Sequence, residues 1–264
     1  MSTSSTGPDA NGNNVVFHEL TAAPRDIDLL RQFYTELYLP EFPDPDERES
    51  LDNMTNYLEL KAQGWHGANN YHIVLLTESG RPVAGSVSDY LSAADAGVIE
   101  FLTVSSAYRR RGLGSRLLRW TETTLAVDAS SRSARALRAI VAEMHDPRIP
   151  DAYHASLGPA ARARIWSGWG YRKLNFDYVQ PALSASQHAA RHLMLLAKIL
   201  NGVTHHTTLR AHHLRAILRE YFYWAMRIEQ PERTAEYQHM CAQLTDDGYV
   251  NLLPLDDYLQ RSGE

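Results

Sequence analysis

The sequence has little of several features that would place it in a specialised class of protein. Its 264 residues include a single cysteine, Cys241, which excludes an intrachain disulfide and favours a reducing compartment. No apolar run approaches the ~20 residues that a membrane-spanning helix needs. The first fourteen residues lack the basic and apolar segments of a secretory signal. We therefore expect a cytoplasmic protein with no membrane partner.

Positively charged residues are fewer than negatively charged ones. Lysine and arginine total 26 against 31 aspartates and glutamates, so the formal net charge is −5. Nucleic-acid binders usually carry a basic face, and this balance argues against a nucleic-acid partner. Hydrophobic residues make up 44% and charged residues 22%, which are ordinary globular proportions. The length allows one large domain, or one standard domain with a smaller one.

Hydrophobic periodicity divides the chain into three parts. Residues 1–14 are polar and small, which predicts a disordered tail. Residues 15–181 mix the periods of strands and helices, and residues 182–264 have the helical period. The expected strands cover residues 15–20, 71–77, 82–90, 98–104, 136–143 and 171–178. The expected helices cover residues 24–39, 44–63, 111–125 and 159–169, then 184–200, 207–228 and 231–244, with one possible strand at 249–253.

This order predicts the fold class. We expect an α/β (α+β) domain over residues 15–181, with a mixed, mostly antiparallel central sheet flanked by helices. An all-helical extension over residues 182–264 would follow it. Hairpins come first in the domain and an αβ crossover follows them, which is why the sheet is expected to be mixed.

The most informative segment runs from Val98 to Ser115. A strand leads into a short loop with the pattern Arg-x-x-Gly-x-Gly (Arg109–Gly114), and a helix follows. Glycine lets the backbone approach a ligand closely, and the first N–H groups of a helix have no intrahelical partner. With the helix dipole and three arginines, the segment is suited to a phosphate or pyrophosphate. It is neither a Walker loop nor a Gly-x-Gly-x-x-Gly dinucleotide turn.

The run from Val104 to Gly114 resembles motif A of the GCN5-related N-acetyltransferases (GNAT). The resemblance covers residues 15–178 and includes the late stretch Arg164–Tyr171. It implies a GNAT-like fold, acetyl-CoA as co-substrate, no metal, and direct acetyl transfer to an amine. The pantetheine arm would lie between the strands at 98–104 and 136–143. The implied cofactor-binding residues are Leu102, Thr103, Val104, Arg109, Arg110, Arg111, Gly112, Leu113, Gly114 and Ser115.

Direct transfer needs a base that takes a proton from the acceptor ammonium. Glu100 is the first candidate, because it interrupts a strand that is otherwise apolar on both faces. Burial there would raise its pKa toward the useful range. Glu143, at the end of the next strand, is the second candidate. Either carboxylate could instead have a purely structural role.

The general acid stays open. Many GNAT enzymes carry a tyrosine where this sequence has Trp166. Tyr171, Tyr153, Tyr178 or Tyr108 could replace it, or the leaving thiolate could take its proton from water. Trp166 and Trp169 are expected to belong to the core.

The acceptor is expected to be a small-molecule amine. Residues 41–52 hold six carboxylates and one arginine, an acidic lip that could attract a cationic acceptor or simply be solvated. The alternatives are a non-catalytic acyl-CoA-binding or partner-binding module and a peptide or protein N-acetyltransferase. The extension could cap the acceptor site, form a homodimer or bind a partner. His188 and His192 lie four residues apart in an expected helix. We expect them to be surface histidines rather than metal ligands.

Overall fold

The computed structural model describes residues 4–8, 14–153, 155–200 and 207–260. Within them, one sheet of ten strands runs in the order β1-β2-β3-β4-β5-β6-β8-β7-β10-β9. Its neighbouring strands are antiparallel except for β5 and β6, which are parallel. The predicted mixed, mostly antiparallel sheet is confirmed. The strands are β1 (Ser4–Pro8), β2 (Asn14–Glu19), β3 (Asn70–Glu78), β4 (Arg81–Leu91), β5 (Ala96–Val104), β6 (Ala139–His145), β7 (Arg172–Leu174), β8 (Leu193–Ile199), β9 (Thr208–Arg210) and β10 (Tyr249–Leu253).

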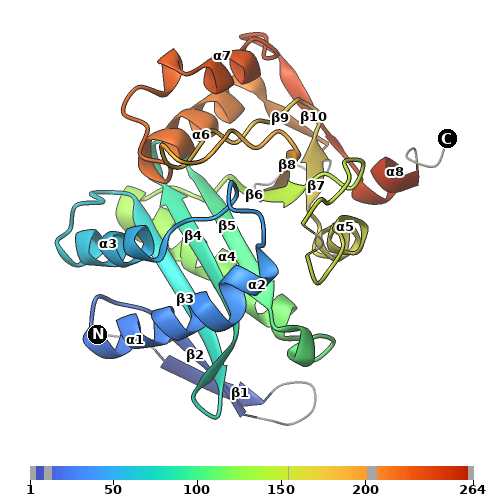
Figure 1. Ribbon diagram of the computed structural model, residues 1–264. Coiled ribbons are helices and arrows are strands. Elements are labelled where there is room, and N and C mark those ends of the chain that lie inside the picture. The colour runs from blue at the N-terminus through green and yellow to red at the C-terminus, as the bar shows by residue number, and fades with distance from the viewer. Residues whose placement is uncertain (1–3, 9–13, 154, 201–206, 261–264) are drawn as a thin grey trace.

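Helices cover both faces of this sheet (Figure 1). One face carries α1 (Pro24–Phe33), a π-helical stretch (Tyr34–Tyr38), α2 (Leu39–Glu41) and α3 (Leu51–Ala62). The other face carries α4 (Leu113–Ser133) and α5 (Pro159–Gly168). Alternate residues of β3 explain the two layers: Ile73 packs under α1 and α3, whereas Val74 packs under α4.

The last part of the chain lies at the end of the sheet where β5 and β6 begin. It contains α6 (Ala211–Trp224), α7 (Ala235–Cys241) and α8 (Leu255–Gln260). In Figure 1, α6 and α7 form the upper part of the molecule, above β5 and β6. Leu214 and Leu218 of α6 belong to one buried cluster with Val98 of β5 and Val141 of β6. The C-terminal helices therefore share a core with the sheet.

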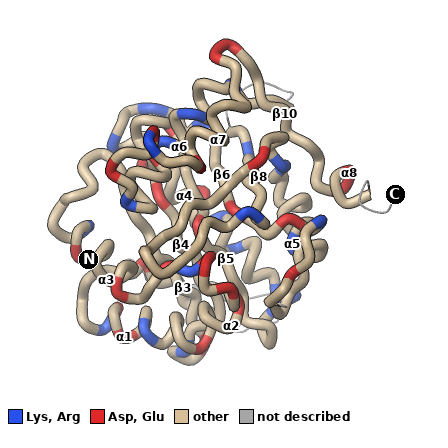
Figure 2. The backbone as a smooth tube through the Cα atoms, turned by 45° about the horizontal axis from the view of Figure 1, so that its top comes forward, with Lys and Arg blue, Asp and Glu red and all other residues tan. Residues whose placement is uncertain are grey.

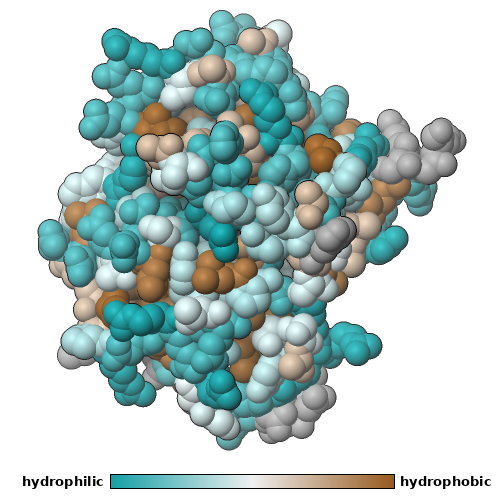
Figure 3. Space-filling model, viewed as in Figure 1, coloured by the Kyte–Doolittle hydropathy of each residue, from teal (hydrophilic) through white to brown (hydrophobic). Residues whose placement is uncertain are grey.

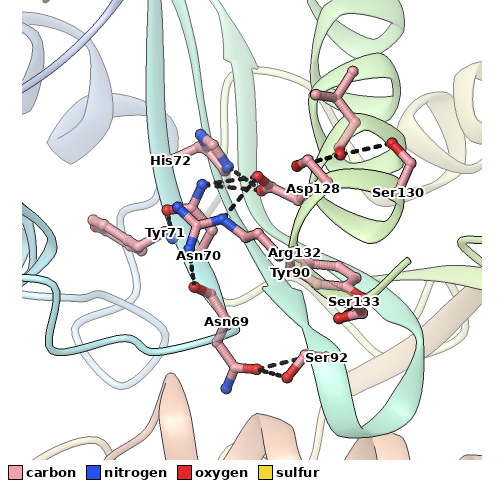
Figure 4. Close-up of polar contacts among 12 residues, drawn as sticks. Asn69, Asn70, Tyr71, His72, Tyr90, Ser92, Asp128, Ser130, Arg132 and Ser133 are labelled. Carbon is pink, nitrogen blue, oxygen red and sulfur yellow. Dashed lines mark hydrogen bonds and ion pairs between the residues drawn. The ribbon is translucent and has the colours of Figure 1, made fainter. Parts of the chain in front are cut away.

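A buried polar network joins β3 to α4 (Figure 4). His72 Nε2 lies 2.6 Å from the carboxylate of Asp128, and the Asn70 side chain donates to the same carboxylate at 3.0 Å. On its other side, His72 Nδ1 lies 2.7 Å from Glu19 of β2. Burial alone would raise the pKa values of Glu19 and Asp128, but the contacts with His72 lower both, that of Glu19 to about 2. We assign a structural role to this network, because its members satisfy one another.

The all-helical extension is a wrong prediction. Residues 184–200, expected as a helix, contain β8, which pairs with β6 and β7 inside the sheet. The run Leu193–Ala197 is apolar throughout and buried on both faces, and such a run has no period that separates a helix from a strand. The expected domain boundary at 181/182 therefore lies between β7 and β8, which are paired neighbours in the same sheet. The helix expected from residue 207 begins with β9, and residues 249–253 form the strand β10.

Three smaller expectations also need correction. Part of the expected disordered tail forms β1, which pairs with β2. The helix expected from Asp44 begins at Leu51, with Ser50 accepting a capping bond from the backbone N–H of Asn53. Asp44 instead accepts from the N–H of Asp46 at 2.9 Å, a local turn that competes with a helix start. The last expected strand, residues 171–178, shortens to β7.

Figure 3 shows the surface on one face of the molecule. The face in Figure 3 is mostly hydrophilic, with apolar side chains in small separate groups. None of the helices in the described part of the chain combines the length and apolar character that crossing a bilayer requires.

Candidate active site

A large cleft opens where β5 ends and α4 begins. Its volume is about 770 Å³, and its walls come from β5, the following loop, the first turn of α4, and α5. Trp166 and Trp169 of the α5 region line it as well, so neither is purely a core residue. The predicted cofactor-binding residues that line the cleft are Leu102, Thr103, Val104, Arg109, Arg110, Gly112, Leu113, Gly114 and Ser115.

The start of α4 presents free backbone donors to this cleft. Gly112 precedes the helix with φ +74°, and no described side chain caps the first turn. Arg110 also has a positive φ, +62°, which turns the loop into the helix. A Cβ at Gly114 would lie 3.2 Å from the Trp169 ring, so glycine allows α5 to pack closely here. An uncapped helix N-terminus of this kind favours an anion.

The arginines of the loop have different roles. Arg111 is turned away from the cleft: it pairs with Glu78, and its guanidinium lies 4.7 Å from the ring centre of Tyr108. Its predicted contact with the cofactor is not part of this geometry. Arg109 reaches across the cleft mouth to Glu41 of α2 at 2.6 Å and also bonds the Ser156 hydroxyl.

The strands β5 and β6 separate after Ile99, three residues before Leu102, which lines the cleft. Their parallel pairing runs from Ala96 opposite Ala139 to Ile99 opposite Ala142. Glu100 and Glu143 are the next residues on the two strands. Opposite β4 the register shifts by one residue, from Val87–Phe101 to Ser88–Ile99, so that Glu100 is the additional residue of a β-bulge. The structure thus brings the two predicted carboxylates to the same opening in the sheet.

Glu100 lies deep in this opening. Its Oε1 is buried and accepts no hydrogen bond from the described residues. Burial and the neighbouring carboxyl of Asp89 raise the pKa of Glu100 well above its usual value. Burial and the Asp89 carboxyl both favour the neutral form of Glu100.

Glu143 has a different environment. Tyr178 donates a hydrogen bond to its Oε1, and Tyr221 of α6 lines the same small cavity as this carboxyl. Burial raises the pKa of Glu143 to about 7, although the hydrogen bond from Tyr178 acts in the opposite direction. A carboxyl with this pKa is well suited to exchange a proton at neutral pH.

Two further cavities adjoin these carboxyls. A small chamber of about 20 Å³ is lined by Glu100, Glu143, Glu47 and Glu49, and α6 covers it with Tyr221, Ala225 and Met226. A pocket of about 200 Å³ shares Glu47 with the chamber and shares Glu41 and Arg162 with the large cleft. Figure 2 shows acidic positions gathered around β5 and α2. We call the chamber and this pocket together the acidic cavities.

The described residues contain one group that could hold a metal ion. Glu47, His145 and His192 place one ligand atom each within 4.8 Å of one another. His192 Nε2 lies 2.6 Å from Glu47, and His145 Nε2 is bonded to the carbonyl of Ile149 at 3.1 Å. Burial alone would raise the pKa of Glu47, but the two histidines lower it to about 2. We assign this group as an ion-pair cluster. His192 comes from the segment before β8 and not from a helix, which sequence periodicity missed.

The four candidate general acids have different contacts in the structure. Tyr171 donates to Glu122 at 3.0 Å, and Trp166 packs edge-on against the Tyr171 ring. Tyr178 is engaged with Glu143, Tyr153 lines the 200 Å³ pocket, and Tyr108 lines the large cleft beside Arg109. The replacement for a tyrosine at position 166 stays a prediction, and Tyr108 is the candidate that lines the large cleft.

Comparisons with known proteins find a matching family model and similar solved structures. Residues 31–143 match the family described as Acetyltransferase (GNAT) family. A solved structure from Bacteroides thetaiotaomicron, assigned to the same family, has 18% identity and a TM-score of 0.55, covering 80% of this chain and 98% of its own. The GNAT domain of S. lividans PAT has 17% identity and a TM-score of 0.46, with coverage of 75% and 97%. No curated protein matches the chain.

Proposed function

We propose that this chain, which contains an acetyltransferase domain of the GNAT family, transfers an acetyl group from acetyl-CoA to a small cationic amine. The observation that carries the proposal is the position of Glu143. It lies where β5 and β6 separate, next to an anion-binding cleft, and burial raises its pKa to about 7. The cytoplasm remains the expected compartment.

The large cleft fits the co-substrate. The uncapped first turn of α4, from Gly112 to Ser115, offers backbone N–H groups to a pyrophosphate, and Arg109 and Arg110 add positive charge beside it. The pantetheine arm would follow β5 past Leu102 toward the separation of the strands. Acetyl-CoA supplies the activated thioester.

Glu143 is the proposed base. It takes a proton from the acceptor ammonium, and the free amine then attacks the thioester carbonyl carbon. The new C–N bond forms as the C–S bond breaks. The nitrogen then loses its second proton, which balances the proton that the departing CoA thiolate takes up to leave as the thiol. Glu100, whose neutral form is favoured by burial and by Asp89, is proposed to shape the acceptor site, and we prefer Glu143 to Glu100 as the base.

The acceptor is proposed to be small because α6 covers the chamber beside Glu143. An extended peptide would need an open groove there. It is proposed to be cationic because the acidic cavities present Glu41, Asp44, Glu49 and Asp151 among their walls, whereas Arg162 is their one arginine in the described part of the chain. The electrostatic attraction between an ammonium group and a carboxylate is strongest where the carboxylate is desolvated.

The test combines binding and turnover. Calorimetry with acetyl-CoA should show binding in the wild type and in Glu143→Gln alike. A panel of diamines, polyamines, amino acids and peptides should give thiol release for the linear cationic amines, and Glu143→Gln should lose at least about a hundredfold of that rate, the lower end of the range for a general base. The exposed Glu59→Gln on α3 is the matched control. Binding without turnover on any amine would favour the non-catalytic alternative.

A further inference from the structure

One arginine in the walls of the cavities has an unsatisfied nitrogen. Arg162 belongs to α5 and lines both the large cleft and the pocket of about 200 Å³. Its side chain is 20% exposed, and its Nε is buried without a hydrogen-bond partner among the described residues. Its ion pair with Asp151 is 3.9 Å long, which is too long for a hydrogen bond. A guanidinium has five N–H donors, so Arg162 can still bind an acceptor group in these cavities.

Arg109, the arginine at the mouth of the cleft, has much closer partners. Its guanidinium donates to the Glu41 carboxylate at 2.6 Å and to the Ser156 hydroxyl at 2.5 Å. Its Nε donates to the backbone carbonyl of Val104 at 3.2 Å. An anionic group that enters the 200 Å³ pocket would therefore find its donors at Arg162, which lines that pocket, and not at Arg109.

The fold fixes the position of Arg162. The next residue, Ala163, is fully buried, and Trp166 of the same helix is 8% exposed; both belong to the core cluster beneath α5. The helix cannot rotate its arginine into solvent without exposing these two residues. A charged group that is largely buried is costly unless it is paired and hydrogen-bonded. An anionic group from outside the chain would supply the partner that the Arg162 Nε lacks.

We propose that Arg162 binds a carboxylate of the acceptor, and that the acceptor is a small amino acid with a cationic side chain. The inference rests on the proposed function and narrows its substrate class. A guanidinium and a carboxylate are planar groups that can form two parallel hydrogen bonds. The carboxylates of the acidic cavities suit the ammonium groups of the same molecule. A diamine would leave the guanidinium unpaired.

The position of the pocket also favours an acceptor over the co-substrate. The pocket shares Glu47 with the chamber beside Glu143, so a molecule held at Arg162 can extend toward the proposed base. No residue from the first turn of α4, the proposed pyrophosphate site, lines the pocket. Its volume of about 200 Å³ suits a single amino acid better than a peptide. The other source of an anion is a phosphate of acetyl-CoA, which would reach Arg162 from the large cleft.

The experiment compares pairs of amines that differ in the carboxylate: lysine with cadaverine, ornithine with putrescine, and arginine with agmatine. It measures kcat/KM with acetyl-CoA and, without turnover, the affinity for each amine by calorimetry in the presence of CoA. The proteins are the full chain, Arg162→Gln, Arg162→Lys and the control Arg119→Gln. Arg119 is exposed on α4 and lines neither the cleft nor the pocket.

The wild type should prefer the amino acid in at least one pair by about tenfold to a hundredfold, as expected for hydrogen bonds between charged groups. Arg162→Gln should remove this preference. Arg162→Lys keeps the charge but loses the planar fork, so it should retain part of the preference. Arg119→Gln should retain all of it, and the affinity for acetyl-CoA should stay within about twofold in every variant.

The outcomes distinguish this inference from the proposed function. A wild type that prefers the amino acid in no pair overturns the inference, and so does an Arg162→Gln protein that keeps the preference. If Arg162→Gln instead loses affinity for acetyl-CoA and keeps the preference, the arginine binds a phosphate of the co-substrate. If calorimetry shows a preference that depends on Arg162 but no amine is acetylated, the proposed function fails and the carboxylate site stands.

Discussion

Glu143→Gln should stabilise the protein while it removes the proposed base. Burial raises the pKa of Glu143 from 4.5 to about 7, a difference of about 2.5 units. A unit corresponds to 1.36 kcal/mol, so ionising this carboxyl in the folded state costs about 3 kcal/mol. The folded protein binds the extra proton between pH 4.5 and 7, so the stability contribution is present below that window and is lost as pH rises through it. A glutamine can keep the hydrogen bond from Tyr178 through its amide oxygen, and it carries no charge.

The measurement is urea unfolding of wild type, Glu143→Gln and the control Glu59→Gln at pH 5 and pH 8. At pH 8, Glu143→Gln should exceed the wild type by about 2–3 kcal/mol in unfolding free energy, and near pH 5 the difference should shrink below about 1 kcal/mol. Glu59→Gln should stay within about 0.5 kcal/mol at both values. A pH-independent difference, or a loss of stability at pH 8, would refute the reasoning.

Two further predictions concern other parts of the molecule. His72→Ala should lower the unfolding free energy by about 3–5 kcal/mol at pH 7, because it leaves Glu19 and Asp128 without their shared partner. Their depressed pKa values mean that this contribution is present above pH 4.5 and is lost as pH falls toward 2, which urea titrations at pH 7 and pH 3 would show. Gly114→Trp should abolish the thermal stabilisation by acetyl-CoA, worth about 2.7 kcal/mol at 100 times the Kd. Gly158→Ala, where an added Cβ meets nothing within 4 Å, should keep it.

The sequence allowed the cofactor side of the site to be predicted because its signals are local. Two glycines, a strand and an amphipathic helix stand next to one another in the chain, and together they make one turn. The carboxylates Glu100 and Glu143 could be found for a similar reason, since each interrupts an apolar strand. Their order as bases could not be predicted. It depends on Asp89 and Tyr178, which are distant in sequence and become neighbours only in the fold.

The secondary-structure prediction for the C-terminal segment was wrong because local signals were missing there. A strand such as β8, buried on both faces, has no alternation of polar and apolar residues, so Leu193–Ile199 is indistinguishable by period from a helical stretch. The histidines at 188 and 192 strengthened the wrong interpretation by their spacing. The partner of His192 is Glu47, from a turn before α3, and no spacing rule relates the two.

The acidic cavities also predict how an acceptor would bind. Burial raises the pKa of Glu143 to about 7, so about half of the free protein carries a proton on this carboxyl at pH 7. A polyamine placed beside Glu143 favours its ionised form, and its binding should therefore release protons. Calorimetry of spermidine binding in two buffers of different ionisation enthalpy measures that release directly. We expect up to about half a proton per spermidine at pH 7, and affinity that rises with pH to about 8. Binding with no proton release would mean that the ammonium groups lie away from this carboxyl, and the acceptor site would have to be sought elsewhere along the cleft.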